Sequence, residues 1–164
     1  MVDNKKLRPL GKGLYVRPET LGRMELSPSA DKVVQKFLKT NHFLMRSLSD
    51  FNRLGLGLTQ MFRETFVYNS RRDGEVKLGG RTYFFKKKKF PKNHLDEYLL
   101  VDFLNNIEKL GEDREALLAR FERKWYGKGW EVDYDVVYKF SQRYGKYWVK
   151  KYFQKLDENF EVSA

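Results

Sequence analysis

Basic side chains gather between residues 71 and 89, beside aromatic residues and turn signals. They are Arg71, Arg72, Lys77, Arg81, Lys86, Lys87, Lys88 and Lys89, with Phe84 and Phe85 directly before the lysine run. Such cations neutralise phosphate groups, and neighbouring rings offer stacking surfaces to bases. Alternate residues of an extended run point to opposite faces, so one surface meets at most half of the lysines. Lysines also protect edge strands from aggregation, and both interpretations stay open.

A second basic group follows helical spacing near the C-terminus. A helix is predicted to begin around Asp133, with an apolar face that holds Val137, Phe140, Tyr144 and Trp148. Its other face carries Lys139, Arg143, Lys146 and Lys150. This stripe could follow a phosphate backbone or an acidic protein surface. It is equally what the solvent-facing side of an amphipathic helix looks like.

Residues suited to catalysis are sparse. The two histidines, His42 and His94, stand far apart without acidic partners at ligand spacing, which argues against a metal site or a histidine-based triad. Glu131, Asp133 and Asp135 alternate as in a divalent-cation site of nucleotidyltransferases, but no Gly-Ser phosphate turn precedes them. Carboxylates that complement a helix N-terminus explain them as well. We therefore expect no enzyme, no metal and no cofactor.

The charge of the whole chain points to a polyanionic partner. Its 164 residues include 33 Lys and Arg against 22 Asp and Glu, a formal net charge of +11. Residues 1–90 hold 20 basic and 8 acidic side chains, and residues 91–164 hold 13 and 14. Nucleic acid is the commonest partner for such an excess. The absence of cysteine and of a long apolar run leads us to expect a cytoplasmic protein without a membrane partner.

The pattern of apolar residues predicts an α+β domain. A short hairpin surrounds Gly11-Lys12-Gly13, and Ser27 with Pro28 opens a helix that stops near Asn41. A buried strand or bend at residues 43–45 leads into a helix capped by Ser47. Residues 62–68, 74–78 and 81–87 then read as a three-strand antiparallel meander. Helices over residues 96–110 and 113–126, followed by the one from Asp133, complete a helical C-terminus.

Three segments in this order resemble the AbiEi-like family of antitoxins and transcriptional regulators. The first runs Leu10-Gly11-Lys12-Gly13-Leu14-Tyr15-Val16-Arg17-Pro18 and continues with Leu21-Gly22-Arg23. The second covers residues 47–60, with Asn52-Arg53-Leu54-Gly55-Leu56 at its centre. The third covers residues 65–86 and contains Gly79-Gly80-Arg81-Thr82.

The resemblance implies both an organisation and a function. In that family a winged helix reads operator DNA, an α/β domain follows it, and the antitoxin counteracts a nucleotidyltransferase-type toxin while repressing its own operon. The segment before Gly11 is too short for the helices of a winged domain, so we expect residues 1–24 to be a wing-like hairpin remnant. Residues 25–126 would be the α/β domain, a small three-strand sheet on helices, with residues 127–164 an amphipathic helix packed on it.

Two functions follow from these observations. The first is an antitoxin-like regulator that binds nucleic acid through the meander and the last helix. The second is a protein-interaction module that docks an acidic partner such as a cognate toxin.

Overall fold

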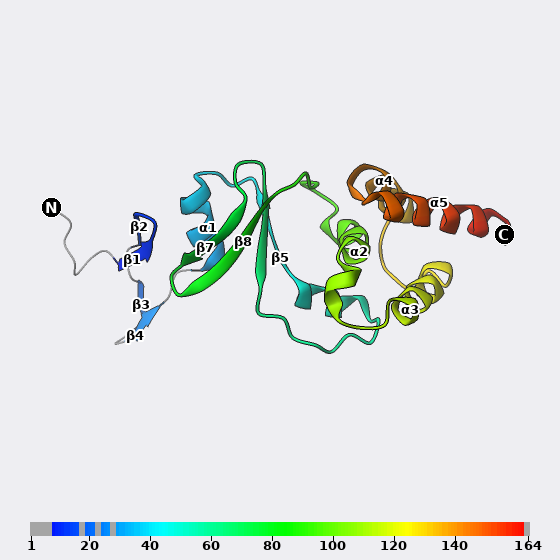
Figure 1. Ribbon diagram of the computed structural model, residues 1–164, viewed down its shortest axis with the longest axis horizontal. Coiled ribbons are helices and arrows are strands. Elements are labelled where there is room, and N and C mark those ends of the chain that lie inside the picture. The colour runs from blue at the N-terminus through cyan, green and yellow to red at the C-terminus, as the bar shows by residue number, and fades with distance from the viewer. Residues whose placement is uncertain (1–7, 17–18, 22–23, 27–28, 163–164) are drawn as a thin grey trace. The chain divides into compact units, whose positions relative to one another are not determined.

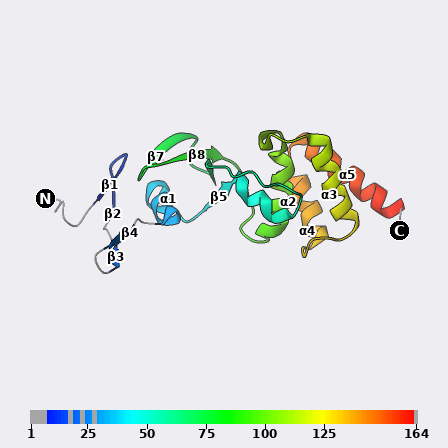
Figure 2. The same ribbon diagram turned by 90° about the horizontal axis from the view of Figure 1, so that it is seen from below.

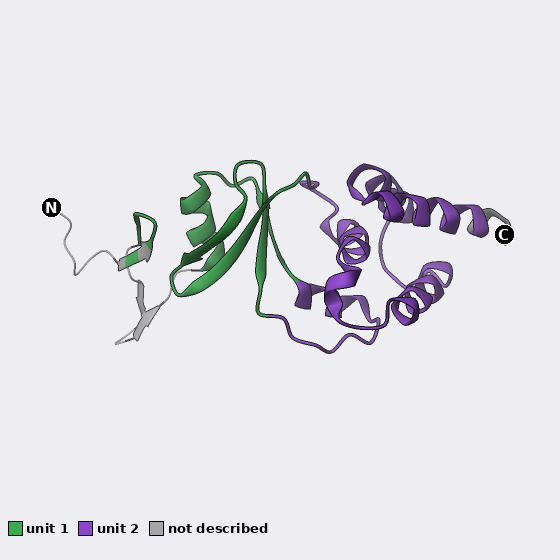
Figure 3. Cartoon of the chain, in the orientation of Figure 1, with its two compact units in different colours: residues 1–47, 63–89 green, residues 48–62, 90–164 purple. Residues whose placement is uncertain are grey.

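A computed structural model describes residues 8–16, 19–21, 24–26 and 29–162. The chain forms two compact units (Figure 3). Residues 1–47 and 63–89 make a sheet unit, and residues 48–62 and 90–164 make a helical unit. This division differs from the expected one, which kept residues 25–126 together as one domain. The general α+β class and the helical C-terminus are confirmed.

The sheet unit is built on a mixed four-stranded sheet. Its strands are β5 (Phe43–Ser47), β6 (Thr65–Asn69), β7 (Gly74–Leu78) and β8 (Arg81–Lys87), in the order β5-β6-β8-β7. The β6–β8 pair is parallel, and the β5–β6 and β7–β8 pairs are antiparallel. The expected antiparallel meander of three strands is therefore wrong. Of the two alternatives for residues 43–45, a strand or a bend, the structure has the strand, β5.

Strand composition explains the observed order. β8 buries Tyr83 and Phe85 on one face and half-buries Phe84 on the other, so it suits a central position. In β7 the buried Val76 alternates with exposed polar side chains, which suits a sheet edge. β8 therefore lies between β6 and β7, and β7 is the edge strand.

Helix α1 (Ala30–Leu38) packs against one face of this sheet (Figures 1 and 2). The side chain of Ser29 caps it by accepting a hydrogen bond from the backbone N–H of Lys32. The expected cap, Ser27 with Pro28, lies outside the described residues. Lys39 ends the helix in the left-handed conformation, before the expected stop at Asn41. The core on this face consists of Val33, Val34, Leu38, Val67, Val76, Leu78, Tyr83 and Phe85.

The expected N-terminal hairpin is present. β1 (Arg8–Gly11) pairs with β2 (Leu14–Val16), and Gly11, Lys12 and Gly13 between them all have positive φ. Leu14 packs on the core beneath α1, and Lys36 donates a hydrogen bond to the carbonyl of Tyr15. A second hairpin pairs β3 (Glu19–Leu21) with β4 (Met24–Leu26).

The helical unit surrounds an aromatic core. It contains the 3-10 helices η1 (Leu48–Leu54) and η2 (Ile107–Leu110) and the helices α2 (Leu95–Asn105), α3 (Arg114–Tyr126), α4 (Tyr134–Tyr144) and α5 (Tyr147–Val162). Phe121 is fully buried, with its ring centre 5.9 Å from that of Phe103 and 6.0 Å from that of Phe153. The helix expected over residues 113–126 is confirmed as α3, whereas the one expected over residues 96–110 is divided into α2 and the 3-10 helix η2. None of the helices within the described residues is long and apolar enough to span a membrane.

The single helix expected from Asp133 onward is wrong, because Gly145 divides it into α4 and α5. Gly145 has extended backbone angles and ends α4. Asn105 of α2 bridges the break: its amide donates to the carbonyl of Tyr144 at 3.2 Å and its oxygen accepts from the N–H of Lys146 at 2.8 Å. A buried side chain thus takes over hydrogen bonds that a continuous helix would make.

Candidate nucleic-acid interface

The sheet unit carries the positive charge of the chain. Its residues include 19 Lys and Arg against 7 Asp and Glu, while the helical unit has 14 and 15. The two units therefore have formal net charges of +12 and −1, which add to the +11 of the whole chain. A polyanion is attracted by the field of the nearby charges, so the sheet unit is the part of the chain that would attract it.

The parallel pairing of β6 with β8 gathers most of the candidate residues at one end of the sheet. Asn69 pairs with Lys87, so the turn that follows Asn69 lies beside the lysine run. We call this group the carboxyl-end cluster, since both strands finish there. It contains Arg71, Arg72, Lys86, Lys87, Lys88 and Lys89.

The buried side chain of Asn69 organises this cluster. Its oxygen accepts hydrogen bonds from the backbone N–H groups of Arg71 and Arg72, at 2.8 and 2.7 Å. Its amide donates to the carbonyls of Val67, Arg72 and Lys86. One side chain therefore fixes both the basic turn and the start of the lysine run.

Two further hydrogen bonds hold the backbone of the lysine run. The N–H of Lys87 donates to the carboxylate of Asp73 at 2.7 Å, and the N–H of Lys88 donates to the carbonyl of Asn69 at 3.0 Å. The cationic side chains thus start from an ordered backbone, which lowers the entropy lost when they bind.

The lysines alternate between the two sides of the sheet, as expected for a strand. The Nζ of Lys86 lies 5.0 Å from the ring centre of Phe66, and the Nζ of Lys88 lies 4.5 Å from that of Tyr68. Lys87 and Lys89 are exposed, and strand alternation places Lys87 on the side of α1. One surface therefore meets only part of the run.

The two arginines of the cluster differ in their local contacts. Arg71 donates a hydrogen bond at 2.9 Å to the carbonyl of Leu38, which is one of the carbonyls left without a helical partner at the end of α1. Arg72 is exposed, and its guanidinium carbon lies 4.5 Å from the ring centre of Phe37. Arg71 thus has a structural role beside any role in binding.

Lys77 and Arg81 lie toward the opposite end of the sheet. Lys77 pairs with Thr82, and Arg81 pairs with Leu78 at the β7–β8 turn. Lys86 is five residue steps along the strand from Arg81, roughly 17 Å at about 3.3 Å per residue. Burial raises the pKa of Tyr83, and the Arg81 guanidinium beside it partly offsets this rise. The expected basic surface is thus two groups, one at each end of β8.

The sequence interpretation passed over Arg63. Thr65 pairs with Tyr83 in the parallel register. Arg63 precedes Thr65 by two residues and Arg81 precedes Tyr83 by two residues, so the two arginines lie near each other. Both are exposed and line the same groove. No signal in the sequence indicates this neighbourhood, because residues 63 and 81 come together only through the parallel pairing.

The C-terminal stripe is divided between two helices of the helical unit. Lys139 and Arg143 belong to α4, Lys146 lies in the break, and Lys150 belongs to α5. Lys139, Arg143 and Lys146 are exposed and Lys150 is half-buried. These residues therefore do not form the continuous stripe of one helix.

The acidic and histidine candidates have structural contacts. The Asp133 carboxylate caps α4 by accepting hydrogen bonds from the N–H groups of Asp135 and Val136. Exposed His94 precedes α2, with its Nδ1 3.8 Å from the Glu97 carboxylate, and His42 is exposed as well. In the described parts of the chain, no three His, Cys, Asp or Glu side chains are grouped so as to hold a metal ion.

Replacing Asn69 with alanine is expected to destabilise the sheet unit by about 2 kcal/mol, because hydrogen bonds of the turn and of β8 lose their partner in a buried position. Urea unfolding followed by far-ultraviolet circular dichroism measures the loss. Asn41→Ala, at an exposed position, is the matched control. Equal midpoints for the two variants would contradict the role given to Asn69.

Comparisons with known proteins give no match: no protein-family model, no curated protein and no solved structure matches the chain.

Proposed function

We propose that the chain is an antitoxin-like transcriptional regulator that binds nucleic acid through the basic surface of its sheet unit. The observation that carries this proposal is the carboxyl-end cluster, in which Asn69 and Asp73 order a turn and a lysine run beside each other. Contacts of this kind go to phosphates, so they give affinity with little choice of sequence. The AbiEi-like resemblance of the sequence supports the regulatory part of the proposal. The proposal assigns the chain no catalytic role.

A salt titration tests this function. We expect the full chain to bind labelled duplex DNA or RNA with a log–log salt slope near −4, as about four phosphate contacts would give, because one surface meets only part of the carboxyl-end cluster. The affinity should then fall roughly two-hundredfold between about 50 and 200 mM salt. Fluorescence anisotropy measures both quantities. Absence of binding to either duplex at the lower salt concentration would sink the proposal.

One observation favours the second candidate, docking of an acidic protein partner. Tyr147 at the start of α5 is 76% exposed, and the Nζ of Lys151 lies 5.5 Å from its ring centre. Exposed tyrosines beside cations are typical anchors of protein interfaces. Co-elution in gel filtration with the product of a neighbouring gene, together with no binding to nucleic acid, would favour this candidate over the first.

A further inference from the structure

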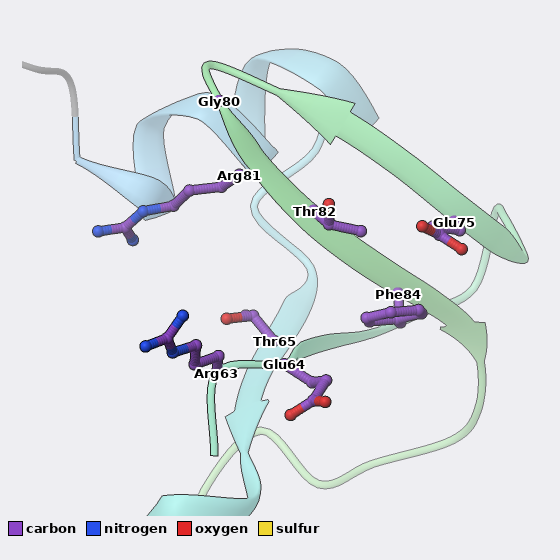
Figure 4. A pocket seen from close by; sticks show the side chains of 8 residues that line it. All are labelled: Arg63, Glu64, Thr65, Glu75, Gly80, Arg81, Thr82 and Phe84. Carbon is purple, nitrogen blue, oxygen red and sulfur yellow. The ribbon is translucent and has the colours of Figure 1, made fainter. Parts of the chain in front are cut away.

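A groove of about 680 Å³ lies in the sheet unit, where the starts of β6 and β8 face each other (Figure 4). Its volume falls in the range of roughly 300 to 1,000 Å³ found for sites that bind small molecules. Two arginines, two glutamates, two threonines and one aromatic ring line it. The groove therefore offers charge of both signs and a stacking surface within one unit.

The basic end of the groove consists of Arg63, Arg81 and Thr65. Figure 4 shows both guanidinium groups on the same side of the groove, with the Thr65 hydroxyl pointing toward that side. Neither arginine forms a salt bridge within the described part of the chain. A phosphate at this end of the groove would accept charge-assisted hydrogen bonds from the two guanidinium groups.

The other end of the groove is aromatic and acidic. Phe84 is half-buried and stands between two register partners, Phe66 on β6 and Glu75 on β7. The ring centres of Phe66 and Phe84 are 5.5 Å apart, so Phe66 supports the ring of Phe84. In Figure 4 the carboxylates of Glu64 and Glu75 lie on the side of Phe84, away from the guanidinium groups. Charge is thus separated along the groove.

This separation decides between two kinds of ligand. A duplex backbone laid along the groove would bring phosphates to Glu64 and Glu75, which repel them. A single nucleotide has the complementary order, with an anionic phosphate at one end and a flat base with N–H donors at the other. Guanine suits a carboxylate best, because its N1–H and its exocyclic N2–H₂ group lie side by side.

We propose that the groove binds one nucleotide of a single strand, with its phosphate at Arg63 and Arg81 and its base stacked on Phe84. The Glu75 carboxylate, directly opposite Phe84, accepts the N–H donors and favours guanine. This inference rests on the proposed nucleic-acid function. It adds that the ligand is single-stranded and that guanine is the preferred base.

The test compares two labelled uridine oligonucleotides, one of which has a guanosine at its centre. Each has about five residues, a length that a single-strand groove accommodates. We expect tighter binding of the guanosine oligonucleotide to the full chain. Phe84→Leu should weaken both by roughly tenfold, since base stacking on an aromatic ring is lost. Phe84→Trp should retain binding, which shows that a loss in Phe84→Leu does not come from misfolding.

Two other variants separate the ends of the groove. Glu75→Gln should abolish the preference for guanosine while the uridine oligonucleotide binds as before. Arg63→Gln should weaken both oligonucleotides and reduce the salt slope by roughly 0.7, the value for one phosphate contact on a single strand. Arg123→Gln, at an exposed position of the helical unit, is the matched control and should change neither.

The outcomes distinguish this inference from the proposed function. Equal binding of the two oligonucleotides, unaffected by Phe84→Leu and Glu75→Gln, would overturn the groove while duplex binding could persist. Absence of binding to oligonucleotides and duplexes alike would remove both. If free guanosine monophosphate displaces the guanosine oligonucleotide, the groove also binds a free nucleotide. If only the oligonucleotide binds, the ligand of the groove is a nucleic-acid strand.

Discussion

Changing Arg72, Lys87 and Lys89 together to glutamine is expected to weaken duplex binding about a hundredfold at about 0.15 M salt. All three side chains are exposed and belong to the carboxyl-end cluster. Each phosphate contact contributes roughly 0.9 to the log–log salt slope, so the slope should decrease by about 3. The fold should be retained, because Asn69 and Asp73 hold the cluster through backbone groups that these changes leave in place.

The matched control removes the same amount of charge from the other unit. Changing Lys139, Arg143 and Lys150 to glutamine lowers the net charge equally, but on the helical unit. Anisotropy titrations at several salt concentrations should give this variant a slope close to that of the unchanged chain. If the salt slope decreased equally in the two triple variants, binding would depend on net charge or on the helical unit. The carboxyl-end cluster would then not be the binding surface.

Local sequence signals predicted most elements of this fold. Period-two alternation found β7 and β8 at their observed bounds, and the recurrence of Leu99, Leu100, Phe103 and Leu104 found α2. These signals arise from residues close in sequence that share one face. The observed elements therefore match the expected ones where only neighbouring residues decide the structure.

The order of the strands depends on distant residues and could not be predicted in this way. Turn signals at residues 72–74 and at Gly79-Gly80 favoured a simple antiparallel meander. The buried side chain of Asn69 hydrogen-bonds to the carbonyl of Lys86, 17 residues later, and so fixes the parallel β6–β8 pair. Its burial and its long-range partner are invisible in a local pattern.

The same limit applies to the candidate site. Composition located the basic residues, but only the parallel register shows that Arg71 and Arg72 lie beside the lysine run. It also places Lys77 and Arg81 at the opposite end of the sheet, where Arg63 and Arg81 line the same groove. Basic residues that are close in sequence thus form two groups at opposite ends of the sheet.

Gly145 is the clearest case in which a local pattern misled the interpretation. The apolar spacing from Val137 to Trp148 continues across it as though one helix ran through. Glycine is tolerated within helices at a cost of about 1 kcal/mol, so one glycine did not signal a break. The break depends on Asn105, a buried side chain of α2 that bonds both sides of the turn.

Replacing Gly145 with alanine is accordingly expected to destabilise the helical unit by about 3 kcal/mol. A Cβ atom at this position would overlap the carbonyl oxygen of Ser141 and lie 3.1 Å from Cγ1 of Val149. Ser141 and Val149 are fully buried, so neither can move aside cheaply. The backbone of the turn must shift instead, which would strain the hydrogen bonds to Asn105.

Urea unfolding followed by tryptophan fluorescence measures this effect selectively, because Trp125, Trp130 and Trp148 all belong to the helical unit. Gly129→Ala is the matched control. A Cβ there would lie 3.3 Å from Cγ and 3.5 Å from the carbonyl oxygen of Lys124, which is tight by only a few tenths of an ångström, so the cost should stay below about 1 kcal/mol. Equal midpoints for the two variants would mean that the turn between α4 and α5 accommodates a side chain, and that the sequence does not require glycine there. A selective loss in Gly145→Ala would instead show that close packing around Ser141 and Val149 divides the two helices.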